Sequence, residues 1–241
     1  WSLARQDYNN EYDTLGEKGS FVNIGASFAS ASASPLSFYK FFAGEGGLRV
    51  PLIISGKGVK TKDQYNNAFT YVTDIAPTIL EISGASAPSD TYGGRHVESM
   101  IGKSLTPITE GKADSVYKPE DNIGYELAGN AALFQGDYKI VKNLVPTGDG
   151  DWHLFNIVTD PGETSDLKEA MTERFNNMKA AYDQYALENN VQALPAGYIQ
   201  QVQVGLNGIK NRFGPQIALF VVFILCLLGF YKAYRVSRRY S

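Results

Sequence analysis

The chain has 241 residues, of which 44% are hydrophobic, 12% aromatic and 20% charged. This much apolar side chain excludes a disordered or collagen-like polypeptide, because burying apolar surface offsets the entropy that is lost on folding. A single cysteine excludes a disulfide framework and any cysteine-rich metal site.

The formal charge of −3 is distributed unevenly along the chain. All 25 acidic residues lie at or before Glu188, so residues 1–188 carry a net charge of −9. Residues 189–241 carry six basic residues and no acidic one. The acidic balance of the first segment argues against nucleic acid as a partner. The asymmetry indicates two physically different segments in one chain.

The first elements in chain order are short. The Ser- and Ala-rich run at residues 27–35 predicts a loop. Residues 48–56 form an apolar run between glycines, which is typical of a strand. Pro51 within this run favours an irregular or edge strand, because proline has no amide to donate.

Residues 71–84 predict a helix. Pro77 fits in its first turn, and Thr73 or Asp74 is a suitable N-cap residue. Gly84 is expected just after the last helical residue, where a left-handed backbone is common.

A second unit begins near Asp121. Residues 130–145 predict a β-hairpin that turns at residues 135–137, and residues 152–158 predict a third strand. A helix is expected from Asp166 to Glu188, with Asp166 and Glu169 as a capping pair. The apolar side chains of this helix recur every three or four residues and predict one buried stripe. They are Leu167, Met171, Phe175, Met178, Tyr182 and Tyr185.

The C-terminal segment predicts a membrane anchor. Residues 217–231 carry no charge, but 15 residues at about 1.5 Å each do not cross a hydrocarbon core of about 30 Å. We therefore extend the span to residues 213–234, where Tyr231 and Tyr234 suit the headgroup region. Cys226 lies inside this span as a small apolar residue. The alternative is a buried core helix of a soluble domain.

The basic residues after the span predict its orientation. They are Lys232, Arg235, Arg238 and Arg239. The positive-inside rule places them in the cytoplasm, and the acidic domain in the periplasm or outside the cell. An exported domain needs a targeting signal, and none precedes Trp1. We therefore expect this sequence to be the later part of a longer product.

Few side chains indicate chemistry by themselves. His96 and His153 lie far apart in the sequence without ligand spacing, and we expect them to be surface or packing residues. Lys40 lies among aromatic residues ahead of a glycine turn, at residues 38–51. A partly desolvated ammonium group there would suit an oxyanion. From these residues alone, a lysine that extends from a hydrophobic surface is the favoured interpretation.

Four motifs in order resemble the late part of a type I sulfatase, and bacterial arylsulfatases most closely. The family pattern has a lysine, then E-G-G-[IL]-R-V-P, then a D-[IV]-x-P-T-[IL]-L helix, then a G-[DN]-[YW]-K element and a D-P-x-E turn. The matching positions here are Lys40 with residues 45–51, 74–84, 133–139 and 154–163.

The resemblance implies an α/β fold in five parts. These are the C-terminal part of an alkaline-phosphatase-like sulfatase domain (1–115), a small antiparallel sheet with one long helix (116–190), a linker (191–212), a single transmembrane helix (213–234) and a cytoplasmic basic tail (235–241). Such enzymes hydrolyse sulfate esters with a formylglycine nucleophile near a bound Ca²⁺. By resemblance, Lys40 binds the sulfate oxygens, whereas Arg49 and Asp74 are structural.

The sequence also departs from the family pattern. The nucleophile motif C/S-x-P-x-R and the Asp and Asn ligands of Ca²⁺ are absent, so we expect no catalytic and no metal-binding residue in this chain. Formylglycine and Ca²⁺ are expected in an N-terminal part, either of the same product or of a separate chain. Alone, the 241 residues are expected to be inert.

Three functions remain open on this basis. The first is the C-terminal part of a membrane-anchored, arylsulfatase-like sulfuric ester hydrolase. The second is a non-catalytic sulfatase-fold subunit of a membrane protein complex, in which other integral membrane subunits would be partners besides the lipid bilayer. The third is part of a related phosphate- or phosphonate-ester hydrolase.

Overall fold

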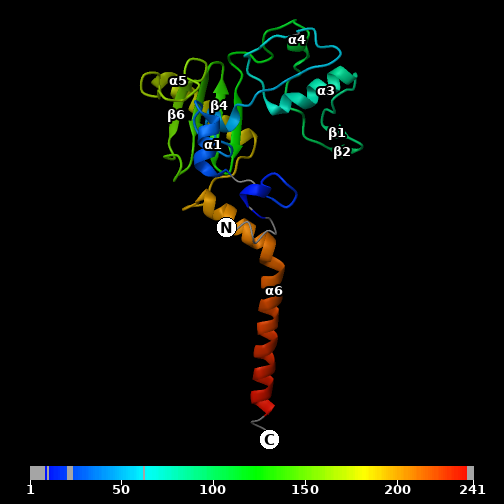
Figure 1. Cartoon of the computed structure of the whole chain (residues 1–241), viewed down its shortest axis with the longest axis vertical. Helices are drawn as coiled ribbons and strands as arrows, with labels where there is room; N and C mark the ends of the chain where they lie inside the picture. Colours follow the sequence, from blue (N-terminus) through cyan, green and yellow to red (C-terminus); the bar gives the residue numbers. More distant parts are fainter. Residues whose placement is uncertain (1–8, 10, 21–23, 62, 238–241) are drawn as a thin grey trace. The chain divides into compact units, whose positions relative to one another are not determined.

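The computed structural model describes residues 9, 11–20, 24–61 and 63–237 (Figure 1). The chain divides into two compact units, one of Trp1–Asn143 with Gly150–Val191 and one of Leu144–Asp149 with Gln192–Ser241. In the first unit the elements are η2 (Tyr12–Thr14), α1 (Gly25–Ala33), α2 (Glu45–Leu48), η3 (Val72–Asp74), α3 (Ile75–Ser83), β1 (Thr91–Tyr92), β2 (Arg95–His96), α4 (Thr106–Thr109), β3 (Ile123–Leu127), β4 (Asn130–Gln135), β5 (Tyr138–Lys142), β6 (Trp152–Asn156) and α5 (Thr172–Glu188). The second unit contains α6 (Gln200–Ser237).

An antiparallel sheet of four strands, in the order β3-β4-β5-β6, organises the first unit. The predicted hairpin is confirmed: β4 pairs with β5, and Gln135 lies opposite Tyr138 across a two-residue turn. Gly136 in this turn has a φ of 57°, a left-handed value that favours glycine. The predicted third strand is confirmed as β6, and β3 is a further strand that the sequence did not indicate.

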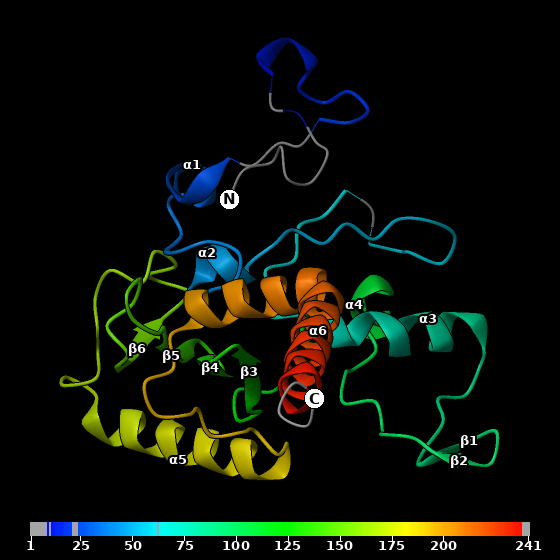
Figure 2. The same ribbon diagram turned by 90° about the horizontal axis from the view of Figure 1, so that it is seen from below.

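One face of the sheet packs against α5, as Figure 2 shows. Leu133, Ile140 and Leu154 point from successive strands to this face and meet the fully buried Met178 of α5. The predicted apolar stripe is confirmed, because its other members all pack against the same cluster. They are Leu167, Met171, Phe175, Tyr182 and Tyr185. A strand alternates its side chains between faces, so the neighbouring residues point the other way.

The opposite face packs against α2 and the segment before it (Figure 2). Ala132, Phe134, Val141 and Phe155 of the sheet form a second buried cluster with Ala43. Leu48 at the end of α2 and Phe69 pack onto it. The sheet therefore has apolar side chains on both faces, each covered by a different part of the first unit.

The predicted helix at residues 71–84 is confirmed as η3 followed by α3. Asp74 is the N-cap residue of α3, and Gly84 follows the helix with a left-handed φ of 72°. The amide of Ala85 then donates to the carbonyl of Leu80 at 2.9 Å, which satisfies one carbonyl of the last turn.

Three local predictions are wrong. Residues 27–35 are mostly helical rather than a loop, since α1 covers Gly25–Ala33 and alanine favours a helix. Residues 48–56 form no strand: Leu48 ends α2, and the residues after it have neither helical nor strand structure. Asp166 does not pair with Glu169 as a cap, because its carboxylate accepts the amides of Leu154 and Lys168 at 3.0 Å each. The helix itself begins at Thr172.

The second unit is dominated by α6, which has 38 residues. Val202–Gly229 within it is long and apolar enough to cross a membrane, with a mean hydropathy of 1.9. The helix begins at Gln200, inside the range 191–212 that the sequence predicted as a linker, and apolar residues such as Val202, Val204 and Leu206 lie in its first turns. Its apolar side chains are exposed within the chain.

Candidate functional site

Lys40 lies in a tight aromatic loop that leads into α2. Phe42 and Ala43 of this loop are buried, while Gly46 and Gly47 lie against its backbone. A Cβ atom on Gly47 would lie 2.2 Å from the carbonyl oxygen of Phe42, and one on Gly46 would lie 2.4 Å from that of Phe38. The two glycines are therefore required by close backbone approach, which lets α2 fold back onto the loop.

The backbone on both sides of Lys40 is strained and firmly held. Phe38 and Phe41 have φ values of 60° and 95°, which bulky residues rarely adopt. The side-chain amide of Asn130 donates to the carbonyl of Phe41 at 2.9 Å, and the amide of Ala43 donates to the side-chain oxygen of Asn143 at 2.7 Å. Asn130 and Asn143, which lie in and next to the sheet, thus hold the Lys40 loop in place through hydrogen bonds to its backbone.

The structure places the Lys40 side chain at the surface. This agrees with the interpretation that the residues alone favoured, a lysine that extends from a hydrophobic surface. Its neighbours Tyr39 and Phe41 are partly buried and Phe42 is buried, whereas Lys40 is exposed. The loop therefore exposes the Lys40 ammonium group on a backbone that is strained at Phe38 and Phe41.

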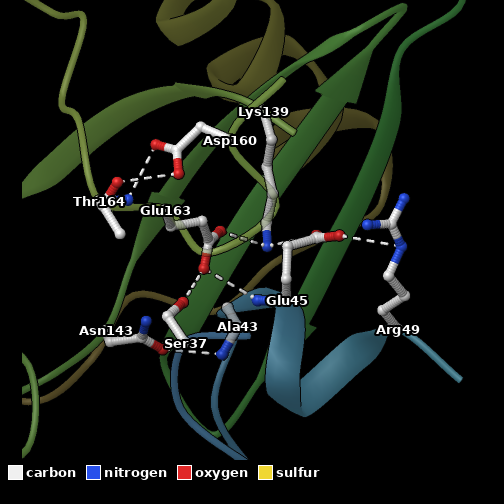
Figure 3. Close-up of polar contacts among 9 residues, drawn as sticks. All are labelled: Ser37, Ala43, Glu45, Arg49, Lys139, Asn143, Asp160, Glu163 and Thr164. Atoms are coloured by element: carbon white, nitrogen blue, oxygen red, sulfur yellow. Dashed lines mark hydrogen bonds and ion pairs between the residues drawn. The ribbon is translucent and has the colours of Figure 1, made fainter. Parts of the chain in front are cut away.

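Three of the four motifs meet in a charge cluster, which we define as Glu45, Arg49, Lys139 and Glu163 (Figure 3). All of its members are buried except Arg49, whose side chain is 47% exposed. The Lys139 Nζ atom lies 3.0 Å from Glu45 Oε1 and 2.8 Å from Glu163 Oε1. Its side chain is 0% exposed, and those of the two glutamates are 4% and 3% exposed. A charge this far from water is stable only when it is paired and hydrogen-bonded.

The remaining oxygens of the charge cluster are also used. Glu163 Oε2 accepts the amide of Glu45 at 2.9 Å and the hydroxyl of Ser37. Glu45 Oε2 lies 3.7 Å from the Nε atom of Arg49 (Figure 3). Two carboxylates thus balance one ammonium and one guanidinium group. The charge cluster thus joins the Lys40 loop to the sheet.

Asp74 is a second buried carboxylate whose oxygens accept several hydrogen bonds. Its Oδ1 atom accepts the amide of Lys103 at 2.8 Å and the hydroxyl of Tyr117 at 2.6 Å, and its Oδ2 atom accepts the amide of Tyr71 at 2.7 Å. Burial, and then the hydrogen bond to Asp74, raise the pKa of Tyr117. Burial raises the pKa of Tyr71 to about 12. These contacts fit the structural role that the sequence suggested for Asp74.

The other candidate groups lie elsewhere. Among the described residues, no group of three His, Cys, Asp or Glu side chains could hold a metal ion. His153 lies 2.7 Å from Asp166 at the start of the segment that leads to α5, and His96 lies in β2. Desolvation opposes the ionisation of Asp166, but hydrogen bonds from the Leu154 and Lys168 amides hold its pKa below the usual value.

Two surface depressions, with volumes of about 560 and 470 Å³, lie around Arg174 and Gln135. Lys40 lines neither of them. The sequence indicated Lys40 as a candidate site residue but did not predict the ion pairs of Lys139 with Glu45 and Glu163. A signal was present, because each of these residues is the charged end of a motif. Only the fold shows that the three ends meet.

The sequence comparisons agree with these motifs. The chain is 31% identical over 203 residues to an uncharacterized sulfatase of Schizosaccharomyces pombe, a match that covers 83% of this chain and 36% of that protein. It is 33% identical over 108 residues to an arylsulfatase of Klebsiella aerogenes, covering 44% of this chain and 23% of the relative. No family model matches the chain.

Some solved structures resemble part of the chain. A putative sulfatase from Bacteroides thetaiotaomicron aligns with 48% of this chain and 24% of its own length, at 20% identity and a TM-score of 0.36. By the sequence comparisons, the chain is a sulfatase homologue that corresponds to a C-terminal region of its curated relatives. It spans roughly a quarter to a third of the length of the curated relatives it matches.

Proposed function

We propose that this chain is the sulfate-binding, membrane-anchored C-terminal part of an arylsulfatase-like sulfuric ester hydrolase. In this role Lys40 donates hydrogen bonds to the sulfate oxygens of the substrate, and a further sulfatase part supplies the reactive groups. The chain alone is inert.

The observation that carries this proposal is the placement of Lys40. Its ammonium group has three N–H donors and a full positive charge, both suited to a sulfate group whose charge is spread over several oxygens. The strained turn at Phe38 and Phe41, held by Asn130 and Asn143, keeps the loop in one conformation. A fixed cation stabilises developing charge without the cost of reorganisation.

We expect the reactive groups, the formylglycine nucleophile and the ligands of Ca²⁺, to come from residues outside this chain. The described residues offer no ligand group for Ca²⁺, and Cys226 lies in the middle of the apolar helix α6. Formylglycine would supply the nucleophile, and Ca²⁺ would supply positive charge next to it. The role of this chain is to bind the sulfate group and to hold the catalytic part at the membrane.

The anchoring part of the proposal rests on α6. Its candidate span of 28 residues exceeds the roughly 20 that a bilayer requires. Lys232 and Arg235 follow the span, and Arg238 and Arg239 lie beyond the described residues. By the positive-inside rule, this charge supports a cytoplasmic C-terminus with the acidic globular unit on the opposite side.

The test uses the complete product that contains this chain, solubilised from the membranes of the organism that encodes it. Hydrolysis of 4-nitrophenyl sulfate that is lost in Lys40→Ala supports the proposal. Faster hydrolysis of 4-nitrophenyl phosphate would instead indicate a phosphate-ester hydrolase. Copurification with a stoichiometric membrane assembly that hydrolyses neither ester would indicate a non-catalytic subunit.

A further inference from the structure

Helix α6 is longer than a bilayer requires. Its candidate span, Val202–Gly229, has 28 residues. At about 1.5 Å per residue this span measures about 42 Å, whereas a hydrocarbon core is about 30 Å thick. The predicted span at residues 213–234 measures about 33 Å and fills the core by itself. The first turns of α6, residues 200–212, then lie outside the core.

Helix α6 bends between these first turns and its longer remainder. Figure 1 shows an oblique first part and a straight part that ends in red, and in Figure 2, which looks along the straight part, the first turns run sideways. Pro215 lies inside the helix, and Gly214 precedes it. Proline has no amide to donate, and its ring crowds the carbonyl four residues earlier, so helices kink there. The first turns therefore do not continue in the direction of the span.

The first turns carry an apolar stripe. Its members recur at intervals of four, three and four residues and are Val202, Leu206, Ile209 and Phe213. Residues with this spacing share one face of a helix. All of them are exposed within the part of the chain that the structure describes, except Phe213, which is partly buried. The stripe ends where the predicted span begins.

The opposite side of the same turns is polar. Gln203, Asn207 and Asn211 follow one another at intervals of four residues. The side-chain amide of Gln203 donates to Oδ1 of Asn207 at 3.0 Å, in agreement with their position on one face. Val204 is an apolar residue on this side. A helix with one apolar and one polar face suits the boundary between water and an apolar medium.

Lys210 and Arg212 flank the stripe on opposite sides. At about 100° per residue, Lys210 lies about 70° to one side of the centre of the stripe and Arg212 about 90° to the other. The guanidinium carbon of Arg212 lies 5.7 Å from the centre of the Phe213 ring. Residues 189–241 contain no acidic side chain that would repel a phosphate group. Cations at the edges of an apolar face are suitably placed for the phosphates of a phospholipid layer.

We propose that residues 200–213 form an interfacial helix, which lies along the phospholipid headgroups on the side of the membrane that carries the globular unit. The apolar stripe enters the boundary of the acyl chains, and Lys210 and Arg212 contact lipid phosphates. This inference rests on the membrane anchor of the proposed function. The occupant is the bilayer because the stripe continues directly into the predicted span, with the bend at Pro215 between the two directions.

The direct test measures the depth of single side chains in the full chain, reconstituted into vesicles of phosphatidylcholine and phosphatidylglycerol. A nitroxide spin label is attached to Leu206→Cys or to Asn207→Cys, each combined with Cys226→Ser. Electron paramagnetic resonance then compares collisions with oxygen, which concentrates in acyl chains, and with a water-soluble nickel chelate. We expect an oxygen-to-nickel collision ratio about ten-fold higher at Leu206 than at Asn207.

Three results would overturn the proposal. Access to nickel at both positions would mean that the first turns form a stalk in water. Access to oxygen at both positions would place them in the hydrocarbon core. Little access to either reagent at Leu206 would mean that protein rather than lipid covers the stripe.

A matched pair of variants tests the stripe without labelling it at the site of the change. With the label on Ile209→Cys, Leu206→Asp is expected to lower the oxygen-to-nickel ratio about ten-fold, because a carboxylate at the acyl boundary lifts the helix into water. Asn207→Asp adds the same charge on the polar side and should leave the ratio unchanged. Thermal unfolding of the globular unit should be the same in both variants. An unchanged ratio in Leu206→Asp would contradict the proposal.

The anchor and the interfacial helix fail separately. The same label on Cys226 of the otherwise unchanged chain reports on the span. Access to oxygen at Cys226 together with access to nickel at Leu206 would remove the interfacial helix and leave the anchor. Access to nickel at both positions would remove both. Hydrolysis of 4-nitrophenyl sulfate, measured independently, tests the remainder of the proposed function.

Discussion

At the scale of single residues, Lys139 connects parts of the chain that are far apart in the sequence. It lies in β5 and holds Glu45 at the start of α2 and Glu163 in the turn after β6. A buried ammonium between two carboxylates cancels their repulsion, so the three residues depend on one another. The Lys40 loop is thereby held on the sheet.

Lys139→Ala is therefore expected to destabilise the protein by about 3–5 kcal/mol, because two carboxylates would remain buried without a cation. Urea unfolding of the full chain, followed by tryptophan fluorescence, measures this loss. The control replaces the whole set, with Lys139→Met, Glu45→Gln and Glu163→Gln together. It should recover most of the stability, and a triple variant as unstable as Lys139→Ala would contradict the account.

Glu126 of β3 provides a pH test at the same scale. Burial raises its pKa from 4.5 to about 7, although the charge of Lys142 acts in the opposite direction. The folded protein thus binds this proton more tightly than the unfolded chain does, so the stabilisation is complete below about pH 4.5. It is lost as the pH rises towards 7.

Glu126→Gln is expected to remove this component of the pH dependence. Because the side chain is only partly buried, we expect a difference on the order of 1 kcal/mol between pH 4.5 and 7.5 after solvent screening. Thermal melts of both proteins across this range measure it. Parallel stability curves for the wild type and the variant would show that Glu126 does not titrate as described.

At the scale of elements, α5 tests the packing of the sheet. Met178 is fully buried against Leu133, Ile140 and Leu154, whereas Asn176 on the same helix is exposed. Met178→Ala should cost about 2–5 kcal/mol through lost burial and a cavity. Asn176→Ala should change the free energy of unfolding by less than about 0.5 kcal/mol. Equal effects of the two substitutions would mean that α5 does not cover this face.

The elements that the sequence predicted correctly are those whose pattern is local. The stripe of α5 follows from spacing alone, and Gly84 marks the end of α3 because its backbone is left-handed. The β4–β5 hairpin follows from its Gly136 turn. Strand β3 was missed although its apolar residues alternate, because glycine and glutamate, which occupy positions 124 and 126, are depleted in strands. Gly124 is there because a Cβ atom would lie 2.4 Å from the ring of Tyr185.

The features that the sequence did not predict correctly depend on residues that lie far apart in the sequence. The run at residues 50–54 has the composition of a strand, but a strand requires a partner, and the described residues provide none. The charge cluster is likewise invisible in the sequence, because Glu45 and Lys139 are 94 positions apart. For Lys40, by contrast, the motif gave the position in the chain, and the sequence already favoured a lysine at the surface.

At the scale of the whole molecule, residues 1–188 carry a net charge of −9 and residues 189–241 carry +6. The acidic part folds around the sheet, and the part without acids contains α6 with its apolar span. The apolar side chains of this helix are exposed within the chain, and we propose that a bilayer covers them.

Cys226, the chain's single cysteine, reports on this environment. If α6 crosses a bilayer, a water-soluble maleimide should fail to label Cys226 in intact membranes and should label it after the membranes are dissolved in SDS. Ser165→Cys, at an exposed position before α5, is the control and should react in both conditions where the reagent reaches that side. Rapid labelling of Cys226 in intact membranes would contradict the membrane span.

The central claim is that Lys40 binds the sulfate group of a substrate. The most direct test is kcat/KM for 4-nitrophenyl sulfate in the complete, solubilised product, compared among the wild type, Lys40→Ala and Lys18→Ala. Lys18 is an exposed lysine outside the aromatic loop. We expect a loss of about 10²–10³-fold for Lys40→Ala, as for removal of one fixed oxyanion donor, and no change for Lys18→Ala. An unchanged kcat/KM in Lys40→Ala would contradict the account.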